Sequence, residues 1–281
     1  MKTIGGQAVI EGVLMRDKEN YSIAVRKDNK IKTIKKKIKQ PNRFWRIPFF
    51  RGIYSLFETL LIGIKALNYS AKQQEEKEEE LKTWHLVLTL ILAIVFALII
   101  FKLIPLSIAQ LFSKSNKLFQ NNIIFNLIEG FFKILIFVLY VYIIGLFKDV
   151  KTLFQYHGAE HKSVNCYEAD KELTISNVKK YSTLHVRCGT SFIMIVILIS
   201  IFVYSFIPNI AFLWKYFYRI LLLPVIAGIS YEILKLEGKY KENKFWQLIS
   251  KPGLFIQKLT TAEPNEKQIE VAIKALKSIN S

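Results

Sequence analysis

The chain has 281 residues, with 40 Lys and Arg against 22 Asp and Glu, and 52% of its residues are hydrophobic. Its 12 Gly and 7 Pro exclude a collagen-like or disordered chain, and 2 Cys cannot form the disulfide framework of a small secreted module. Because the apolar residues form long runs, the composition favours a membrane protein over a nucleic-acid-binding protein.

Residues 1–43 are predicted to form a small cytoplasmic β-element. The first residues, MKTIGGQAVIEGVLMR, lack the sustained apolar core and the small-residue cleavage site of a signal peptide. Residues 21–25 and 31–38 carry alternating β-branched residues on either side of Asp28-Asn29. This pattern is typical of a β-hairpin.

Residues 44–85 are predicted to contain an amphipathic helix followed by a charged linker. Between Phe49 and Leu67, helical spacing gathers apolar side chains on one face and polar side chains on the other. This pattern is typical of a helix that lies in the membrane interface. The alternative, a further membrane span, would place the basic residues downstream on the outside. The run 73–82 is predicted to be solvated.

Residues 86–236 are predicted to form a bundle of four membrane-spanning helices, so that the fold class is mainly α. The apolar runs that carry this prediction are 86–112, 123–147, 191–207 and 216–236. The first run is about 40 Å long as a helix, enough to cross a hydrocarbon core of about 30 Å. The second run contains Glu129 and Lys133, one helical turn apart, where their charges can neutralise each other.

The distribution of basic residues predicts the orientation in the cell membrane. Four crossings put both termini and the loop 148–190 on one side. The loops on the other side contain Lys114, Lys117, Lys215 and Arg219, whereas loop 148–190 alone contains seven basic residues. The positive-inside rule therefore predicts that the termini and this loop are cytoplasmic. Residues 237–281 are predicted to be a cytoplasmic helical tail.

The loop 148–190 concentrates residues that bind metals. Three of the four histidines and both cysteines lie between His157 and Cys188. The sequence HGAEH has the H-x-x-E-H spacing of inverted zincins, in which two imidazoles hold zinc and the glutamate is the general base. This spacing predicts His157 and His161 as metal ligands and Glu160 as the base. The alternative is a pair of interfacial histidines that hydrogen-bond to headgroups or backbone.

A second group of candidates follows in HVRCGTSF, residues 185–192. His185 and Cys188 are three residues apart and can face one centre, and Arg187 adds hydrogen-bond donors. Mixed imidazole and thiolate ligands favour Zn²⁺ over Mg²⁺ or Ca²⁺. The alternative for Cys188 is a buried packing residue.

Two more acidic residues are candidates. Glu232 lies in an apolar run and is predicted at the cytoplasmic membrane level of the loop, where it reaches the site or pairs with Lys235. Glu11, in a block bounded by glycines, is a further carboxylate if the N-terminal element folds over the loop. Otherwise the glycines only permit a tight turn.

The chain resembles the bacterial YqhQ-like family, an integral-membrane family of unknown function. The blocks that carry the resemblance are GGQAVIEGVLMR (5–16), YHGAEHK (156–162), HVRCGTSF (185–192), AGISYE (227–232) and QKLTTAEP (257–264). The resemblance covers essentially the whole length and departs from the family pattern at Val186, where the family has proline. It implies a metal-dependent enzyme whose site includes the residues named above, but no particular reaction.

These observations predict a zinc-dependent hydrolase at the cytoplasmic face of the membrane. Glu160 and Arg187 are the predicted catalytic residues, and the substrate is expected to be a lipid headgroup or a membrane peptide. The alternative is a non-catalytic scaffold or assembly factor with a structural His/Cys/Glu cluster. Nucleic acid is not an expected partner, because the basic residues are spread over flanks suited to anionic lipid.

Overall fold

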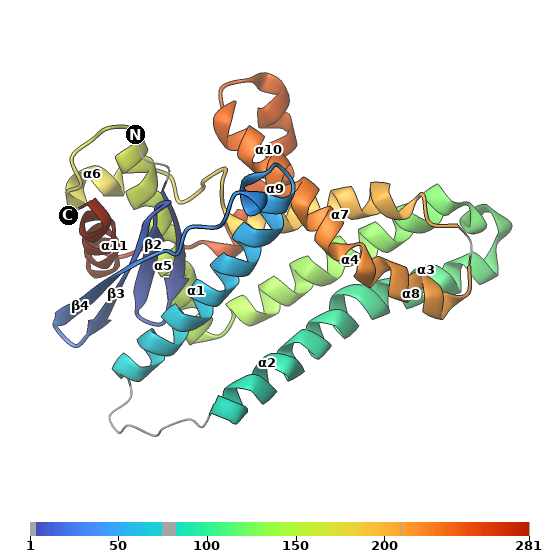
Figure 1. Ribbon diagram of the computed structural model, residues 1–281, viewed down its shortest axis with the longest axis horizontal. Coiled ribbons are helices and arrows are strands. Elements are labelled where there is room, and N and C mark those ends of the chain that lie inside the picture. Colours follow the sequence, from blue (N-terminus) through green and yellow to red (C-terminus); the bar gives the residue numbers. More distant parts are fainter. Residues whose placement is uncertain (1–3, 75–82, 209, 281) are drawn as a thin grey trace.

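The computed structural model describes residues 4–74, 83–208 and 210–280, which form a mainly helical chain with a small N-terminal sheet (Figure 1). In this part of the chain, four antiparallel strands pair in sequence order: β1 Gly5–Val9, β2 Gly12–Arg16, β3 Asn20–Lys27 and β4 Lys30–Lys37. The predicted hairpin is confirmed, since Lys27 pairs with Lys30 across the β3–β4 turn. Asp28 takes a φ of 53° there, the left-handed value that tight turns use.

The helices follow in chain order. They are α1 Phe50–Gln74, α2 Thr83–Leu98, α3 Ile104–Ser115, α4 Asn122–Gly145, α5 Lys148–Glu168, α6 Ile175–Lys179, α7 Gly189–Tyr204, α8 Phe212–Leu221, α9 Leu223–Lys239, α10 Lys244–Thr260 and α11 Glu266–Asn280. A π-helical turn, Ile99–Leu103, joins α2 to α3, and short 3₁₀ turns lie at Phe44–Arg46 and Lys117–Gln120. Asn121 and Asn243 cap α4 and α10 by accepting backbone hydrogen bonds.

The sheet is covered on both faces. Val13, Met15 and Ala24 point to a core shared with α5 and α11, whereas Leu14, Ile23 and Val25 point to a core shared with α1. Successive strand residues alternate between the two cores because side chains point to opposite faces with a period of two. Segments from the predicted parts 1–43, 86–236 and 237–281 therefore share one core (Figure 1).

Helix α5 occupies the first half of the segment predicted as loop 148–190. Its buried residues Tyr156, Ala159 and Val164 belong to the core shared with the sheet and α11. The H-x-x-E-H spacing predicts His157 and His161 on one helical face, and the helix extends over the whole range Lys148–Glu168. A helix forms because its apolar stripe is buried against the sheet, and packing of this kind supplies most helical stability.

The amphipathic segment near residue 49 is helical, as predicted, and forms α1. Its buried positions include Gly52, Ile62 and Ala66, which face the sheet and α9. Phe57 and Leu60, from the predicted apolar face, are exposed. This exposure is compatible with a membrane interface around the helix, which stays a prediction. Residues 75–82 of the predicted linker lie outside the described residues.

The prediction of four spanning helices is not confirmed. Within the described ranges, two stretches are long and apolar enough to cross a membrane, Val87–Ser115 and Asn122–Gly145. The pair α8 and α9 is bent by 45° and would be a third if it counts as one span. The predicted run 216–236 is broken there because Pro224 lies at the start of α9. Helix α7 is apolar but shorter, at 16 residues.

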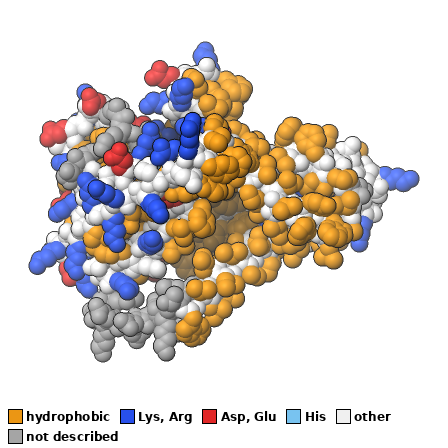
Figure 2. Space-filling view, in the orientation of Figure 1, with side chains coloured by type: hydrophobic (Ala, Val, Ile, Leu, Met, Phe, Trp, Pro, Cys, Tyr) orange, Lys and Arg blue, Asp and Glu red, His pale blue; other side chains and the backbone are white. Residues whose placement is uncertain are grey.

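The surface divides into an apolar and a basic part. Figure 2 shows hydrophobic side chains over the helices α2, α3, α4 and α8, and many Lys and Arg side chains over the sheet. Helix α2 exposes Val87, Ile91 and Val95, among other apolar residues. A contiguous apolar surface of this size marks contact with membrane or protein. The apolar helices are therefore compatible with a membrane protein.

Candidate metal centre

Three of the four predicted metal ligands come together at the start of α7. His157 and His161 lie one turn apart on α5, with ring centroids 4.4 Å apart. Cys188 is the residue that precedes α7, and its Sγ lies 3.3 Å from His157 Nε2. One ligand atom from each of these three residues lies within 4.8 Å of the others. We call these three residues the His/His/Cys cluster.

Main-chain carbonyls fix the orientation of both imidazoles. His157 Nδ1 lies 2.8 Å from the carbonyl oxygen of Thr260, and His161 Nδ1 lies 2.6 Å from that of Thr183. A carbonyl oxygen can only accept, so each Nδ1 is the donor, and in the neutral imidazole Nε2 then carries the lone pair. Imidazoles that bind metals have this same arrangement, in which the outer nitrogen donates to a carbonyl or carboxylate.

The surroundings of Cys188 suit a thiolate ligand. The residue is buried at the N-terminal end of α7, and Thr190 N donates to Sγ at 3.4 Å. The amides at a helix N-terminus favour negative charge nearby. The sulfur of Cys188 and the imidazole of His157 therefore face each other from two different helices.

The donor set fits zinc. Tetrahedral zinc, with bonds of about 2.0–2.1 Å to nitrogen and 2.3 Å to sulfur, separates neighbouring N and S ligands by about 3.5 Å. The distance of 3.3 Å between His157 Nε2 and Cys188 Sγ is close to this value. Two imidazoles and a thiolate are ligands that zinc prefers over magnesium or calcium.

Glu160 lies beside the cluster and against the sheet. A Cβ atom on Gly6 of β1 would lie 2.8 Å from Glu160 Oε1, so only glycine leaves room for this carboxylate. Burial raises the pKa of the Glu160 carboxyl to about 7, and the charge of His157 opposes this rise. Gly6 and Glu160, from two blocks of the sequence resemblance, therefore pack directly on each other.

His185 lies outside the cluster, although its ring centroid is 5.8 Å from that of His161. Its Nδ1 accepts from Arg187 N at 3.3 Å, and its Nε2 lies 3.7 Å from Glu168 Oε1. Burial lowers the pKa of His185, while the nearby carboxylate of Glu168 raises it. Its contacts therefore place this predicted ligand in a neighbouring polar group.

Arg187 belongs to the same neighbouring group. Its guanidinium donates to Glu168 Oε1 and, at 3.2 Å, to the carbonyl oxygen of Ile4. Burial raises the pKa of Glu168, but the nearby His185 and the charge of Arg187 lower it to about 2. Arg187 thus connects the loop before α7 to the end of α5 and to the residue before β1.

The remaining carboxylate candidates have separate partners. Glu11, at the β1–β2 turn, accepts a hydrogen bond of 3.0 Å from the hydroxyl of Tyr156 on α5. Glu232 accepts from Arg51 Nε at 2.7 Å and from Phe49 N at 3.1 Å. Glu232 therefore joins α9 to the start of α1. The sequence analysis instead predicted that it reaches the site or pairs with Lys235.

Sequence reasoning assigned no role to the residues that deliver the carbonyls. A Cβ atom on Gly158 would lie 2.1 Å from the carbonyl oxygen of Ala262, so the segment after α10 crosses α5 at this glycine. That crossing brings the carbonyl of Thr260 to His157. Gln257 binds the backbone N and O of His185, each at 2.9 Å. The block QKLTTAEP, one of those that carry the family resemblance, contains these residues, but the sequence alone does not show which residues they contact.

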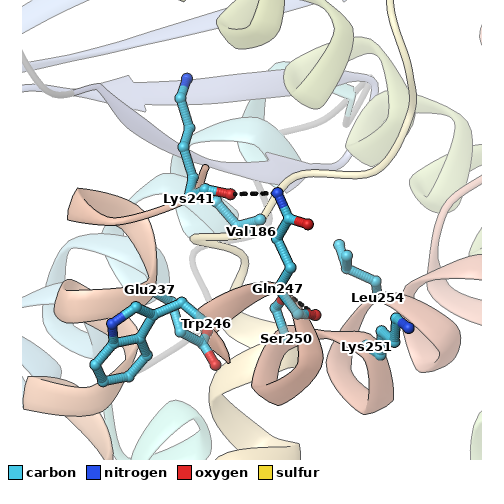
Figure 3. Close-up of a pocket in the computed structure, with 8 residues that line it drawn as sticks. All are labelled: Val186, Glu237, Lys241, Trp246, Gln247, Ser250, Lys251 and Leu254. Carbon is cyan, nitrogen blue, oxygen red and sulfur yellow. Dashed lines mark hydrogen bonds between the residues drawn. The ribbon is translucent and has the colours of Figure 1, made fainter. Parts of the chain in front are cut away.

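A cavity of about 280 Å³ is lined in part by the loop that carries Cys188 (Figure 3). Its lining consists of Val186, Glu237, Lys241, Trp246, Gln247, Ser250, Lys251 and Leu254. Val186 comes from this loop, and Glu237 comes from α9. Glu237 is 1% exposed, and neither of its carboxylate oxygens has a hydrogen-bond partner among the described residues.

The fold and the site define a mainly helical chain with apolar helices of membrane-spanning length and a buried His/His/Cys cluster. Residues 47–281 match the family described as "Protein of unknown function (DUF1385)". The chain is 37% identical over 293 aligned residues to "Uncharacterized protein YqhQ" of Bacillus subtilis (strain 168), with 98% of this chain and 91% of that protein covered. The chain belongs to this family, which confirms the resemblance carried by the five blocks. No solved structure matches it.

Proposed function

We propose that the protein is a zinc-dependent hydrolase that acts at the cytoplasmic face of the cell membrane. The observation that carries this proposal is the His/His/Cys cluster, in which two imidazoles have their outer nitrogens committed to backbone carbonyls. Three protein ligands are typical of catalytic zinc, which keeps its fourth position for water, whereas four ligands are typical of structural zinc.

The chain supplies a candidate base for the reaction. Zinc would lower the pKa of a bound water to about 7 and polarise the oxygen of a carbonyl or phosphoryl group. Glu160 precedes His161 and interacts electrostatically with His157, so it is the carboxylate best placed to accept a proton from that water. Arg187 contacts Glu168 and Ile4, and this contact supports a positioning role for it.

The position of the cluster supports a substrate at the membrane surface. Helix α5 starts three residues after the end of α4, a candidate span, and Cys188 directly precedes the apolar helix α7. The cluster is therefore close in the chain to the ends of two apolar helices. Together with the positive-inside rule, this supports a multi-pass protein with the cluster on the cytoplasmic side. A lipid headgroup or a membrane peptide would reach it there.

Metal analysis of the purified full-length protein tests the proposal. We expect about one zinc per chain in the wild type and a loss of at least about tenfold in affinity in His157→Ala, His161→Ala and Cys188→Ser. His185→Ala is the matched control, since its imidazole contacts Glu168 instead. Equal, substoichiometric zinc in all five proteins would remove the hydrolase proposal.

The second candidate function is a scaffold with a structural metal site. It is favoured by the way that His185, Gln257 and Arg187 connect α5, α10 and the N-terminal segment beside the cluster. Loss of zinc in His185→Ala would indicate a closed sphere of four ligands and support this role. A Glu160→Gln variant separates the two functions: if it keeps zinc but fails to restore growth of a deletion strain, a base is supported. Full restoration supports the scaffold.

A further inference from the structure

The apolar helices carry a large excess of positive charge. Residues 83–145 and 189–222 contain a single acidic residue, Glu129. The same ranges contain six basic residues: Lys102, Lys114, Lys117, Lys133, Lys215 and Arg219. This excess lies in the part of the protein proposed above to sit in the membrane, where ionisable side chains mark functional sites.

Four of these basic residues form a ladder with two aromatic rings. Lys215 Nζ lies 4.6 Å from the centre of the Phe125 ring, and Arg219 Cζ lies 5.5 Å from it. On the other side, Arg219 Cζ lies 4.9 Å from the centre of the Tyr204 ring. Lys133 Nζ lies 4.8 Å from that centre, and Lys102 Nζ lies 3.1 Å from the Tyr204 hydroxyl. We call this arrangement the cationic ladder.

The ladder is buried and short of negative charge. Lys133, Arg219 and Lys215 are 4%, 3% and 7% exposed. Glu129 pairs with Lys133 Nζ at 2.6 Å and with Arg219, so one carboxylate serves two cations. The aromatic faces and Asn126, which accepts from Arg219, are neutral partners, and Glu129 is the one acidic residue in the sequence of these apolar ranges. Burial of charge is costly unless opposite charge compensates it, so the ladder favours a bound anion.

A polar cavity adjoins the Lys215 end of the ladder. Its volume is about 260 Å³, and it lies between α3, α4 and α8. Its lining consists of Gln110, Ser113, Lys114, Gln120, Asn122, Phe125 and Lys215. Phe125 and Lys215 belong to both the cavity and the ladder. The amide side chains of Gln110, Gln120 and Asn122 and the ammonium group of Lys114 provide donors for an anion, whereas the hydroxyl of Ser113 already donates to the carbonyl oxygen of Gln110 at 2.9 Å.

We propose that this cavity binds a phosphate group, carried by a phospholipid or present as free phosphate. A phosphate group offers several acceptor oxygens and at least one negative charge, which matches the two lysines and the amide side chains of the lining. The lipid source fits the exposed apolar side chains of Leu111, Leu213 and Phe217 on the same helices, along which acyl chains can lie. The cavity is at the end of the helices away from the sheet (Figure 1), so this proposal is independent of the metal centre.

Native mass spectrometry of the full-length protein in detergent tests the proposal. Phosphatidylglycerol is titrated beside diacylglycerol with the same acyl chains, which lacks the phosphate. We expect the wild type to retain phosphatidylglycerol and not diacylglycerol. Lys215→Gln and Lys114→Gln should each weaken this binding by about tenfold, the effect of one lost hydrogen bond to a charged group. In a separate titration with inorganic phosphate, the thermal unfolding temperature is measured to test whether the free ion binds.

Lys117→Gln is the matched control, because Lys117 is exposed at the same end of the helices and does not line the cavity. It should bind phosphatidylglycerol as the wild type does. Lys114 is also exposed, so Lys114→Gln tests the lysine contribution to binding if Lys215→Gln fails to fold. Lys215→Arg, which keeps the charge, should retain binding. Stabilisation of the wild type by inorganic phosphate alone, lost in Lys114→Gln, supports the site with the free ion as its ligand. Equal retention of both lipids without this stabilisation, or an equal loss in Lys117→Gln, overturns the proposal.

Discussion

At the residue scale, the orientation of His157 and His161 depends on main-chain acceptors. The carbonyls of Thr260 and Thr183 receive their Nδ1 hydrogens, so a side-chain substitution at either threonine leaves the acceptor in place. A displacement of the backbone, in contrast, would release the ring. The segment of Thr260 is held close by the hydrogen bond of 2.9 Å from Ala262 N to Phe154 O, and Gly158 leaves room for this crossing.

Gly158→Ala should therefore weaken both the fold and the zinc site. The added Cβ would lie 2.1 Å from a backbone oxygen, which cannot rotate away as a flexible side chain could. We expect a loss of about 1–3 kcal/mol in the free energy of unfolding and about 10–100-fold in zinc affinity. Thermal unfolding and competition with a zinc chelator measure these two quantities.

Gly189→Ala is the control for this prediction, because a Cβ there meets nothing within 4 Å and alanine favours the helix. Equal losses in both variants would show that the Gly158–Ala262 contact does not position His157.

At the element scale, the end of α5 is joined to the loop before α7 by Glu168. This carboxylate pairs with Arg187, which also donates to the carbonyl of Ile4 before β1. One acidic residue thus helps hold three segments, and it lies beside the cluster rather than in it. The stability of this junction depends on Glu168 remaining ionised.

Replacement of Glu168 by Gln should reduce the sensitivity of the protein to acid. The pKa of Glu168 is lowered to about 2 in the folded protein, so its ionised form stabilises the fold above the usual value of about 4.5. This contribution is lost as the pH falls through that interval toward 2. For the wild type we expect up to about 3 kcal/mol of stability to depend on it. Unfolding by denaturant between pH 2 and 5 measures the difference between the two proteins.

Glu172→Gln is the matched control, since Glu172 is exposed close by on the same chain segment. If Glu172→Gln and Glu168→Gln change the acid profile equally, the pairing of Glu168 with Arg187 does not account for it.

At the scale of the whole molecule, residues distant in sequence build the domain that carries the site. Ser22 Oγ on β3 donates to the carbonyl of Ala275 on α11, 253 residues away. The sheet is thereby closed on one face by α5 and α11 and on the other by α1. The apolar helices extend away from this domain (Figure 1), which places the proposed membrane on one side of it.

Single-cysteine labelling of intact cells tests this placement. We expect a probe at Lys117→Cys, at the far end of the apolar helices, to react with a membrane-impermeant reagent. A probe at Lys171→Cys, near the end of α5, should stay unlabelled until the cells are opened. Both positions are exposed, and the native Cys166 and Cys188 are buried, which limits background labelling. The reverse pattern would overturn the proposed orientation, and labelling of both probes from outside would argue against α4 as a crossing helix.

Local patterns accounted for the features that depend on neighbouring residues. The alternation around Asp28 predicted the hairpin, and the i, i+4 spacing put His157 and His161 on one helical face. Chain length and hydropathy identified the apolar runs but did not reveal the break before α9 or the full extent of the helix around His157. Whether residues 148–168 form a helix depends on the sheet and α11 that cover its apolar side.

The sequence by itself determined the family, the hairpin, the apolar helices and the paired histidines, because each of these features depends on a pattern of residues that are close together in the sequence. Only the tertiary structure decided that Cys188 approaches His157 while His185 approaches Glu168, and that Glu232 pairs with Arg51. It also decided that Lys102, Lys133, Lys215 and Arg219 meet around two rings. The physical reason is that these contacts join helices whose relative positions are set by packing, and packing depends on surfaces that no local spacing encodes.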